Sequence, residues 1–548
     1  MPQRGPACYN SRMNTAFQDT TVSIVMMLSD RVPYGPAAFR TGLQAAADQD
    51  HPRTEVLVVD DRGPAATLDE IMSGVEGAVP IRHLPGQYAN RAAMLNAGLE
   101  AATGAFVLLV FNDRAEVVLR RSAVRTMLMA ATRRGPAVWV YGDYELIDAD
   151  GQRHERHLPD WHPGRLRDGT DFGAAWLCAA GALRELGGLN EQLTAADLYD
   201  LRLRLGERAA PIHIANRYAG SLYAVRAPAA AHNVFDYLLA DRDSQLEMEQ
   251  TLTAHLKRTH AYLAPGEHVR PVEYDADQEQ HFKDCVASVV IPVNHRPEFI
   301  GRAIESVQQQ TVRAVEAIVV VNGGTDDPTC AEVRRYGEGG DRYDAARPAV
   351  RLIVVDINNL GLCLNTGIAA ARGKIYVQLD SDDRLKPDAV EKLLAVFDAD
   401  PTVGMVIGSY EVWNLDPDSG QIVRNADIPV VTHDEWTVAN GRNNLLRING
   451  AGAPRSAHIN VIADAGWFGV NDDPSCRNYG EDYDLVLRIS ERYGIGRVWE
   501  PIYDVIRHAG GTDHAIDQAT IDRNDNAKDH MRLEALRRRQ RLNARSTS

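Results

Sequence analysis

The chain has 548 residues, 45% of them hydrophobic and 24% charged, a composition typical of a globular protein of about two to four domains. Its 59 basic and 75 acidic residues leave a formal charge of −16, which argues against nucleic-acid binding because phosphate contacts need a basic surface. The six cysteines are scattered without a CxxC pair, which argues against a disulfide framework or a cysteine zinc site and favours a reducing, cytoplasmic location.

Two features of the sequence bear on export and membrane insertion. Residues 1–20 lack the apolar core of a signal peptide, and we expect them to be disordered. No apolar run approaches the roughly 20 residues of a transmembrane helix, so we expect no membrane-spanning segment.

Apolar runs with strand character alternate with helix-length amphipathic stretches along the chain. In the first half we expect strands at 22–28, 55–60 and 105–111, and helices near 36–48 and 89–102. In the second half we expect strands at 287–293, 317–321, 351–356 and 374–379, and helices near 297–309 and 361–372. Continuous apolar strands separated by helices predict an α/β fold with parallel sheets covered on both faces.

The two halves are an internal repeat. NAGLEAATGAFVLLVFND, which begins at Asn96, matches NTGIAAARGKIYVQLDSD, which begins at Asn365, without a gap through Asp113 and Asp382. Two later pairs follow in the same order: YELIDADGQ with YEVWNLDPDSG, and YDLRLRL with YDLVLRI. A repeat unit of this length indicates duplicated domains.

The segments outside the repeat are interpreted as connectors. Residues 232–263 read as one long helix and 264–279 as extended chain. The sequence therefore predicts a disordered terminus (1–20), a first domain (21–226), a helical linker (227–284), a second domain (285–515) and a basic C-terminal helix and tail (516–548). The terminal helix is either a solvated helix or a patch for an anionic acceptor or for the other domain.

The first local signal for chemistry is Asp380-Ser381-Asp382-Asp383, directly after the strand KIYVQL. Acidic residues at the carboxyl edge of a strand stand where open α/β sheets bind ligands. Two carboxylates spaced i and i+2 can face one divalent cation, and Mg²⁺ or Mn²⁺ prefers such oxygen ligands and bridges them to phosphates. Acidic loops without this role are common, so the position after a buried strand is what favours a metal site.

Two further signals lie closer to the C-terminus. Glu481 and Asp482 open the helix DLVLRISERYG, where acidic residues are either a structural cap or a general base presented at a helix N-terminus. His508 follows a predicted strand and is either structural or a ligand for a metal or a phosphate.

These residues carry a resemblance to a known family. Over about 285–510 the sequence resembles a family 2 glycosyltransferase with the GT-A fold: VASVVIPVNHRPEFIGRAIESVQQQT, AIVVVNGGTDD, NNLGLCLNTGIAAARGKIYVQLDSDD and GEDYDLVLRI match its motifs in order. The first half resembles the same fold more weakly, over about 20–226. The resemblance implies two tandem GT-A domains, joined by a long helix, of which the second is catalytic.

The resemblance also implies roles for individual residues. Pro292, Val293, Asn294, Asn322, Asp380 and Ser381 would bind the donor, a nucleotide diphospho-sugar with a UDP-sugar as the first candidate. Asp380, Asp382 and His508 would hold Mn²⁺ or Mg²⁺. Asp482 would be the catalytic base, with Glu481 orienting the acceptor or sharing the role. Where the family usually has an aspartate pair for the base of the nucleotide, this chain has Val321-Asn322.

The reaction implied is an inverting transfer of the sugar to a hydroxyl of a glycan or a small-molecule acceptor. Transfer builds positive charge on the anomeric carbon and negative charge on the departing diphosphate, which a divalent ion neutralises. A carboxylate on the opposite face activates the acceptor hydroxyl, so one displacement suffices and no enzyme nucleophile is needed.

The first half departs from this pattern at each position. Phe111-Asn112-Asp113-Arg114 stands where the second half has Asp380-Ser381-Asp382-Asp383, Asp197-Leu198 replaces Glu481-Asp482, and Tyr223 or a neighbour replaces His508. Phe111 cannot ligate a metal, although Asp60-Asp61 retains the aspartate pair. We therefore expect a degenerate, catalytically silent first domain. The alternative is a second, metal-free transferase in which Arg114 replaces the cation.

Three other functions stay open. A bifunctional two-site transferase or polymerase is disfavoured by the eroded first-half motifs, and a non-catalytic carbohydrate-binding scaffold by the intact second-half acids. A nucleotidyltransferase would share the sheet and the metal, but HRPEF does not supply its glycine-rich phosphate loop. A homo-oligomer is compatible with the sequence.

Overall fold

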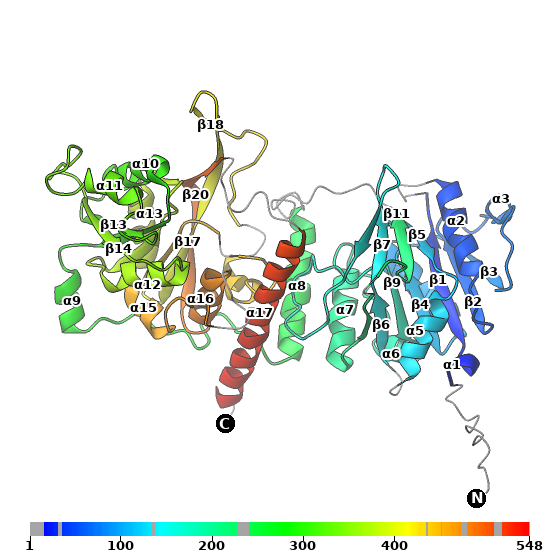
Figure 1. The fold of residues 1–548 in the computed structure, drawn as a ribbon. Helices are drawn as coiled ribbons and strands as arrows, with labels where there is room; N and C mark the ends of the chain where they lie inside the picture. Colours follow the sequence, from blue (N-terminus) through cyan, green and yellow to red (C-terminus); the bar gives the residue numbers. More distant parts are fainter. Residues whose placement is uncertain are drawn as a thin grey trace, which may run out of the picture. The chain divides into compact units, whose positions relative to one another are not determined.

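The computed structural model describes residues 16–30, 35–133, 137–216, 218–226, 241–433, 437–450, 452–472, 479–508 and 518–546. The chain divides into two compact units (Figure 1). Unit 1 comprises Met1–Pro163 and Asp168–Thr251, and unit 2 comprises Gly164–Arg167 and Leu252–Ser548. The boundary at Thr251 falls inside helix α8 (Arg242–Arg258), a part of the chain that the sequence analysis assigned to the linker.

Unit 1 is built on a seven-stranded sheet, blue to cyan in Figure 1. The strands, in chain order, are β1 (Val22–Leu28), β2 (Thr54–Asp60), β3 (Ile81–Pro85), β4 (Phe106–Val110), β6 (Trp139–Gly142), β9 (Ala175–Ala179) and β10 (Ile212–Ile214). A smaller sheet holds β5 (Glu116–Leu119), β7 (Tyr144–Ile147), β8 (Arg153–Arg156) and β11 (Tyr223–Arg226). The helices are α1 (Ala16–Asp19), α2 (Pro36–Ala47), α3 (Asp69–Met72), α4 (Arg91–Ala101), α5 (Ala123–Thr132), α6 (Ala180–Glu185) and α7 (Asp197–Arg208).

Unit 2 has one nine-stranded sheet. Its strands are β12 (Ala287–Val293), β13 (Val315–Val321), β14 (Ala349–Val354), β15 (Ile375–Gln378), β16 (Arg384–Leu385), β17 (Val403–Leu415), β18 (Ile422–Arg424), β19 (Arg455–His458) and β20 (Gly494–Arg507). Its helices are α9 (Ala276–Phe282), α10 (Pro297–Gln308), α11 (Thr329–Arg334), α12 (Leu360–Ala369), α13 (Ala389–Ala399), α14 (Gly441–Asn444), α15 (Ile459–Asp464), α16 (Glu481–Ile489) and α17 (Gln518–Ser546), with a 3₁₀ turn at Val438–Asn440.

The large sheets of the two units share one strand order. Unit 1 runs β3-β2-β1-β4-β9-β6-β10, and unit 2 runs β14-β13-β12-β15-β19-β17-β20 before it adds β16. The directions agree as well, because β9 and β19 are each antiparallel to both of their neighbours. The α/β class is therefore confirmed, but the sheets are mixed and not purely parallel.

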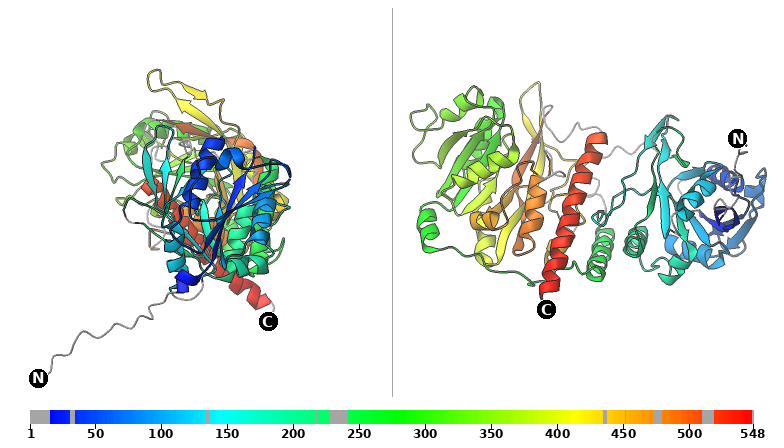
Figure 2. Two further views of the ribbon diagram at one scale, coloured as in Figure 1. Left: turned by 90° about the vertical axis from the view of Figure 1, so that its right-hand side faces the viewer. Right: turned by 60° about the horizontal axis from the view of Figure 1, so that its bottom comes forward.

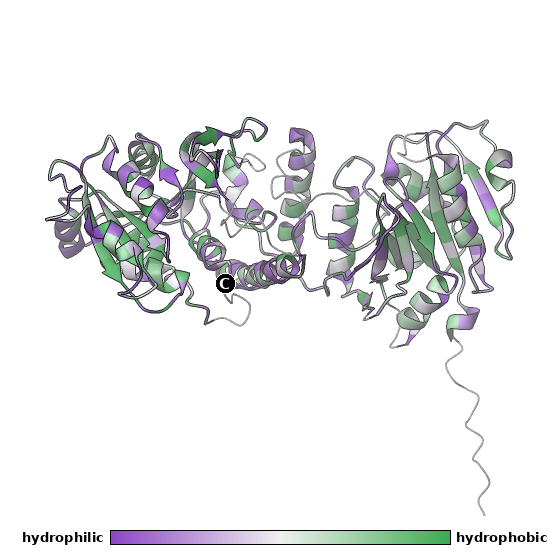
Figure 3. Cartoon of the chain, turned by 45° about the horizontal axis from the view of Figure 1, so that its top comes forward, coloured by the Kyte–Doolittle hydropathy of each residue, from purple (hydrophilic) through white to green (hydrophobic). Residues whose placement is uncertain are grey.

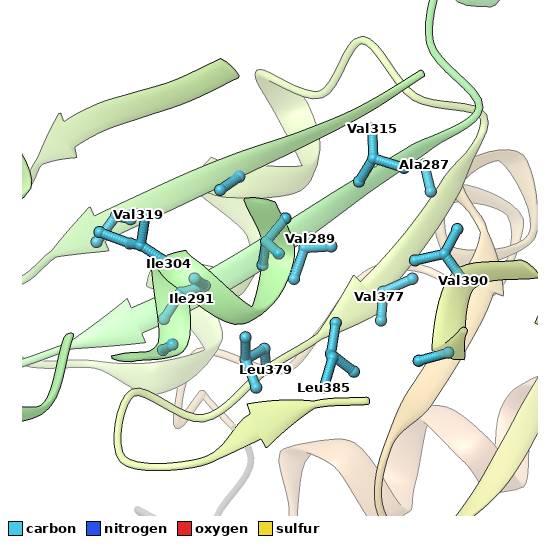
Figure 4. Packing of buried hydrophobic residues seen from close by; sticks show 14 of the residues in the cluster. Ala287, Val289, Ile291, Ile304, Val315, Val319, Val377, Leu379, Leu385 and Val390 are labelled. Atoms are coloured by element: carbon cyan, nitrogen blue, oxygen red, sulfur yellow. The ribbon is translucent and has the colours of Figure 1, made fainter. Parts of the chain in front are cut away.

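The cores follow from the alternation of side chains along buried strands. In unit 2, one face of the sheet packs on α10 and α13, as Figure 4 shows for Ala287, Val289, Ile291, Val315, Val319, Val377, Leu379, Ile304 and Val390. The other face packs on α12, where Gly367 allows close approach to Val290. In Figure 3 the central strands of both units are coloured as hydrophobic, whereas the helices carry both colours.

Three connector predictions are corrected. Residues 16–19, expected to be disordered, form helix α1, whereas 1–15 lie outside the described residues. The long helix expected over 232–263 begins at Arg242 and ends at Arg258 within the described chain, and 227–240 lie outside it. The segment expected to be extended contains α9, which begins after Asp275 because that side chain and Gln278 form a capping box.

Candidate active site

The acidic turn after β15 is fixed by β20. The Asp380 N–H donates to the Tyr503 hydroxyl (3.0 Å), and the Ile506 N–H donates to Asp383 Oδ1 (2.8 Å). Asp383 is buried, and burial together with the charges of Asp380 and Asp382 raises its pKa well above the usual value. Asp383 therefore supports the turn from inside, whereas Asp380 and Asp382 are only partly buried.

Asp382 and His508, two of the three predicted metal ligands, meet in the structure. His508 Nε2 lies 2.9 Å from Asp382 Oδ2, and the Arg296 guanidinium forms an ion pair with the same oxygen. The ring of Phe299 packs on His508 with centroids 4.4 Å apart. Within the described residues, no three His, Cys, Asp or Glu side chains are arranged as a metal site. The donors nevertheless suit a hard divalent ion, provided that Arg296 moves off Asp382.

The second acidic motif begins α16. Gly480 precedes it with φ 85°, a left-handed conformation that glycine adopts at little cost. Burial opposes ionisation of Asp482, but the positive charges of Arg455 and Lys528 hold its pKa below the usual value. Burial and the charge of Asp482 raise the pKa of Glu481 to about 7. Asp482 is therefore the more acidic carboxylate of the pair and is ionised at neutral pH, as a general base must be, whereas Glu481 is only partly ionised there.

Arg455, on β19, is a residue that the sequence analysis did not select. Its Nη1 lies 2.9 Å from Asp482 Oδ2 and donates to the Gly452 carbonyl (2.6 Å), and its Nε donates to Gln378 Oε1 (3.3 Å). Arg296 was missed as well. A lone arginine on a short strand or before a helix carries no local signal, and only the fold brings these two to the acidic motifs.

The predicted donor-binding residues lie where neighbouring parallel strands end. Pro292 and Val293 close β12, Asn294 follows it, and Asn322 follows β13, with its N–H donating to the Val293 carbonyl (3.0 Å). Asn322 Nδ2 donates to Asn358 Oδ1 (3.1 Å), whereas Asn322 Oδ1 is buried without a hydrogen-bond partner among the described atoms.

Two of these residues are less accessible than a donor contact requires. The Val293 side chain lies in the core cluster, because it belongs to the face of β12 that packs on α10. Ser381 is buried within the acidic turn. Only the backbone of Val293 can line a ligand pocket, and Ser381 contributes to the shape of the turn.

The corresponding acids of unit 1 are bridged by an internal arginine. Arg91, at the start of α4, donates from Nη1 to Asp113 Oδ2 (2.9 Å) and from Nε to Asp197 Oδ2 (2.9 Å). Asn112 is buried and exchanges hydrogen bonds with the backbone of Met27. Tyr223 is buried and accepts from the Ala174 N–H (2.8 Å), so it is a core residue.

The remaining aspartates of unit 1 are also engaged. Asp60, half of the retained aspartate pair, accepts two hydrogen bonds from the Arg62 side chain (2.9 and 2.7 Å) and lies 2.8 Å from His83 Nε2. Asp61 Oδ1 accepts from the Tyr88 N–H (2.7 Å). Arg114, the alternative cation, is exposed, with Nε 3.9 Å from Asp113 Oδ2.

The basic C-terminal helix is part of the site's support. Helix α17, red in Figures 1 and 2, packs against α16, and a side chain at Gly480 would meet Met531. Arg532 and Arg539 are fully buried: Arg532 pairs with Asp529 (2.5 Å), and Arg539 donates to the Arg442 carbonyl (2.7 Å). The interpretation as a solvated helix is therefore wrong. In the described chain, no helix has the length and apolar character needed to cross a bilayer.

Comparisons with known proteins agree with these motifs. Residues 288–449 match the model of the family Glycosyl transferase family 2, so unit 2 carries a domain of this family. Chondroitin synthase of Escherichia coli is 26% identical over 227 residues, which cover 41% of this chain and 30% of that protein. An uncharacterised glycosyltransferase of Rickettsia felis is 25% identical over 405 residues, 68% of this chain and 62% of that one. The chain spans under a third of the length of the first relatives it matches, the chondroitin and hyaluronan synthases.

Solved structures with similarity share little sequence. A fragment of TarS from S. aureus in complex with UDP-GlcNAc aligns with a TM-score of 0.33 and 16% identity over 42% of this chain and 62% of the fragment. The mannosyltransferase PcManGT from Pyrobaculum calidifontis, in complex with GDP-Man and Mn²⁺, aligns with a TM-score of 0.32 and 16% identity over 57% of this chain and 86% of that one.

Proposed function

We propose that this chain, whose second unit carries a glycosyl transferase family 2 domain, is an inverting, divalent-metal-dependent glycosyltransferase with one active site in unit 2. The proposal depends on one observation: two carboxylates of unit 2, Asp382 and Asp482, lie in different environments. Asp382 lies beside His508 at the carboxyl edge of the sheet, while Asp482 is held ionised by Arg455. These are the two charge requirements of sugar transfer: a site for a cation and a base for the acceptor.

Asp380, Asp382 and His508 would hold the Mn²⁺ or Mg²⁺ ion. When bound, the ion supplies positive charge that stabilises the departing diphosphate. Arg296 pairs with Asp382 in the structure and must leave that oxygen. A guanidinium released beside a diphosphate pairs well with its oxygens, so Arg296 is the residue of this chain best placed to bind the leaving group.

The proposed chemistry is a single displacement. An acceptor hydroxyl oxygen forms a bond to the anomeric carbon while the bond from that carbon to the diphosphate oxygen breaks, and the bonding electrons leave with the nucleoside diphosphate. Asp482 takes the hydroxyl proton. Glu481, with its raised pKa, can donate a hydrogen bond that orients the acceptor. Attack from the face opposite the leaving group inverts the anomeric configuration.

Donor recognition is proposed at the ends of β12 and β13. Asn322 Oδ1 is buried without a partner among the described atoms, so the Asn322 side chain would have to turn toward the ligand for a base N–H to reach this oxygen. A UDP-sugar is the first candidate, because uracil has an N–H flanked by carbonyl oxygens. The relatives named chondroitin and hyaluronan synthase favour a glycan acceptor.

Unit 1 is proposed to be a degenerate GT-A copy without catalysis. The identical strand order and the sequence repeat support duplication of a domain, with the boundaries predicted above. Arg91 already joins Asp113 to Asp197, the positions that match Asp382 and Glu481, so a fixed guanidinium stands where a cation would bind. This ion bridge argues against the alternative of two active sites. The ionised state of Asp482 argues against the alternative of a non-catalytic carbohydrate-binding scaffold.

A cytoplasmic location belongs to the same proposal, because the described cysteines Cys178, Cys285, Cys330 and Cys363 are free thiols, as a reducing compartment favours.

The test is release of nucleoside diphosphate from a panel of UDP- and GDP-sugars, with and without Mn²⁺, in the presence of oligosaccharide acceptors. We expect one donor class to be turned over, with dependence on the metal and on Asp482. A chain that binds donors but releases no diphosphate with any acceptor would favour the carbohydrate-binding scaffold. Turnover that survives loss of Asp382, His508 and Asp482 together would place the active site elsewhere.

A further inference from the structure

A continuous chain of polar contacts joins the two acidic motifs of unit 2. Asp482 Oδ2 lies 2.9 Å from Arg455 Nη1, Arg455 Nε donates to Gln378 Oε1 (3.3 Å), and Gln378 Nε2 donates to Asp380 Oδ1 (3.3 Å). The Tyr376 hydroxyl also donates to Gln378 Oε1 (3.2 Å). The chain thus runs from α16 through β19 and β15 to the acidic turn.

These side chains share one face of the sheet because of strand periodicity. Tyr376, Gln378 and Asp380 alternate with the core residues Val377 and Leu379, which point to the α10 side. β19 pairs with β15, which places Arg455 beside Gln378. The orientation is therefore set by rigid, buried strands and not by loops, and rigid elements hold a reacting group to the accuracy that catalysis needs.

Unit 1 replaces every member of this chain with an apolar residue. Leu109 and Phe111 stand at the positions of Gln378 and Asp380, and Leu198 at that of Asp482. Trp176 pairs with Leu109 where β4 and β9 run side by side. This pair matches Arg455 and Gln378, which lie side by side on β19 and β15 of unit 2. Phe111 and Trp176 meet edge to face with centroids 4.8 Å apart, and Leu198 packs against the same cluster.

Because unit 1 replaces all of these polar residues together, the polar contacts of unit 2 are not needed to maintain the fold. The two units share the strand order, so the fold can be built with either set of side chains at these positions. An apolar cluster is moreover the simpler solution, because a buried arginine needs an acceptor for each of its donors. Unit 2 therefore keeps the polar set for a reason other than stability of the sheet.

We propose that Arg455, held by Gln378, is a positioning residue that fixes the carboxylate of Asp482 at a set distance and orientation from Asp380 and thereby couples the acceptor side of the site to the donor side. The inference rests on the proposed function, since it assumes that Asp482 is the base. The planar guanidinium can address Gln378 and Asp482 from different nitrogens at fixed angles, which a lysine ammonium cannot do.

The other charged groups around Asp482 do not substitute for Arg455. Glu481 precedes Asp482 on α16, and Lys528 acts on it from α17, whereas Tyr376 on β15 and Asp380 in the turn after β15 act on Arg455. Lys528 donates to the Asn449 carbonyl and to the Tyr479 hydroxyl (3.1 Å); within the described structure it supplies positive charge near Asp482 without a hydrogen bond or ion pair to that carboxylate. Without Arg455, Asp482 keeps a positive neighbour and loses its orientation.

The experiment compares Arg455→Met, Arg455→Lys and Gln378→Leu in the full chain. Each is measured by calorimetric binding of the Mn²⁺–nucleoside diphosphate complex and by kcat with the turned-over donor and acceptor. We expect binding near the wild-type value for all three, and a loss of kcat of about 100-fold for Arg455→Met, the effect of a misplaced catalytic group. Gln378→Leu, which copies unit 1, should lose less, and Arg455→Lys should recover only part of kcat.

The matched control is Arg351→Met. Arg351 also lies on a strand of this sheet and pairs with a buried acid, Glu316 (2.9 Å), but Glu316 sits at the start of β13, away from the carboxyl edge. The Arg351→Met variant should have a lower melting temperature than the wild type and an unchanged kcat. If Arg455→Met fails to fold, Gln378→Leu decides the question, because it removes no charge.

Wild-type kcat in both Gln378→Leu and a folded Arg455 variant would overturn the inference and leave the proposed function standing. A parallel loss of binding and kcat would also overturn the inference, because the polar contacts would then act on donor binding and not on the catalytic base. Absence of turnover in the wild type with every donor would instead count against the proposed function itself.

Discussion

His508 Nε2 lies 2.9 Å from Asp382 Oδ2, although 126 residues separate the two in sequence. β20 ends at Arg507, directly before His508, and its pairing with β16 brings it alongside the acidic turn. A carboxylate and an imidazole joined in this way are suited to share a divalent ion.

The first prediction concerns this pair. Asp382→Ala should abolish metal-dependent binding of the nucleoside diphosphate, because it removes the oxygen on which His508 and Arg296 converge. Isothermal titration calorimetry with and without Mn²⁺ measures the effect. Asp113→Ala, at the matching position of unit 1, is the control and should leave both binding and turnover unchanged. Retained Mn²⁺-dependent binding in Asp382→Ala would remove Asp382 from the site.

Asp482→Asn should separate binding from catalysis. The amide keeps the size of the side chain but cannot accept the acceptor's proton, so kcat should fall by about 10²–10⁴-fold while donor binding persists. Steady-state kinetics together with calorimetry test this. A turnover close to the wild-type value would transfer the role of base to Glu481.

The pH dependence distinguishes the same two carboxylates. A base is active when ionised, and Arg455 and Lys528 outweigh burial to keep the pKa of Asp482 below its usual value, whereas the pKa of Glu481 is raised to about 7. If Asp482 is the base, kcat should not fall as pH is lowered from 8 to about 5, since ordinary carboxyl groups titrate near 4 and protonated Glu481 can still donate its hydrogen bond to the acceptor. A loss of kcat centred near pH 7 would indicate Glu481.

Arg91→Leu tests the internal bridge of unit 1, because Leu360 occupies the matching position of unit 2. Removal of the guanidinium leaves the buried Asp197 without its partner, and breaking such a pair costs about 3–5 kcal/mol. Chemical denaturation should show an earlier transition for unit 1, with kcat unchanged. A loss of kcat without a loss of stability would revive a second site.

A titration in unit 1 gives a stability prediction. His213 lies between two carboxylates, with Nε2 2.8 Å from Asp143 and Nδ1 2.7 Å from Asp160. Although burial opposes its charge, these acids raise the pKa of His213, so the folded state binds the proton more tightly. The stabilisation is complete below pH 6.5 and is lost as pH rises through the raised pKa. Melting curves of wild type and His213→Gln should therefore converge at alkaline pH.

Much of the fold could be predicted from the sequence, because buried strands of α/β sheets are continuous apolar runs. β12 occupies the predicted 287–293, and α10 lies at 297–308 where 297–309 was expected. The mixed direction of the sheet could not be predicted, since β9 and β19 are short and their pairing depends on contacts distant in sequence.

The residues of the candidate site were selected one by one from the sequence, and the structure shows the contacts among some of them. Asp382, His508, Glu481 and Asp482 were identified because motifs mark them. Arg296 and Arg455 were not, because neither motif nor spacing distinguishes a partner arginine from a surface one. The prediction for the arginines of α17 was wrong. Their polar pattern predicts solvent exposure, whereas Asp529 and backbone carbonyls accept hydrogen bonds that allow Arg532 and Arg539 to be buried.

Helix α17 limits how the protein can be divided into fragments for expression. The family match ends at residue 449, so a fragment cut on that match lacks helix α16 and the proposed base Asp482. A fragment cut after β20 would keep α16 but would leave Gly480 and Tyr483 without the packing of Met531 and Arg532. Asp529 also pairs with Arg165 (2.6 Å), a residue that precedes the rest of unit 2 in the chain. A minimal expression fragment chosen by homology should therefore be inactive for reasons of assembly, and its silence would say nothing about the chemistry of the intact protein.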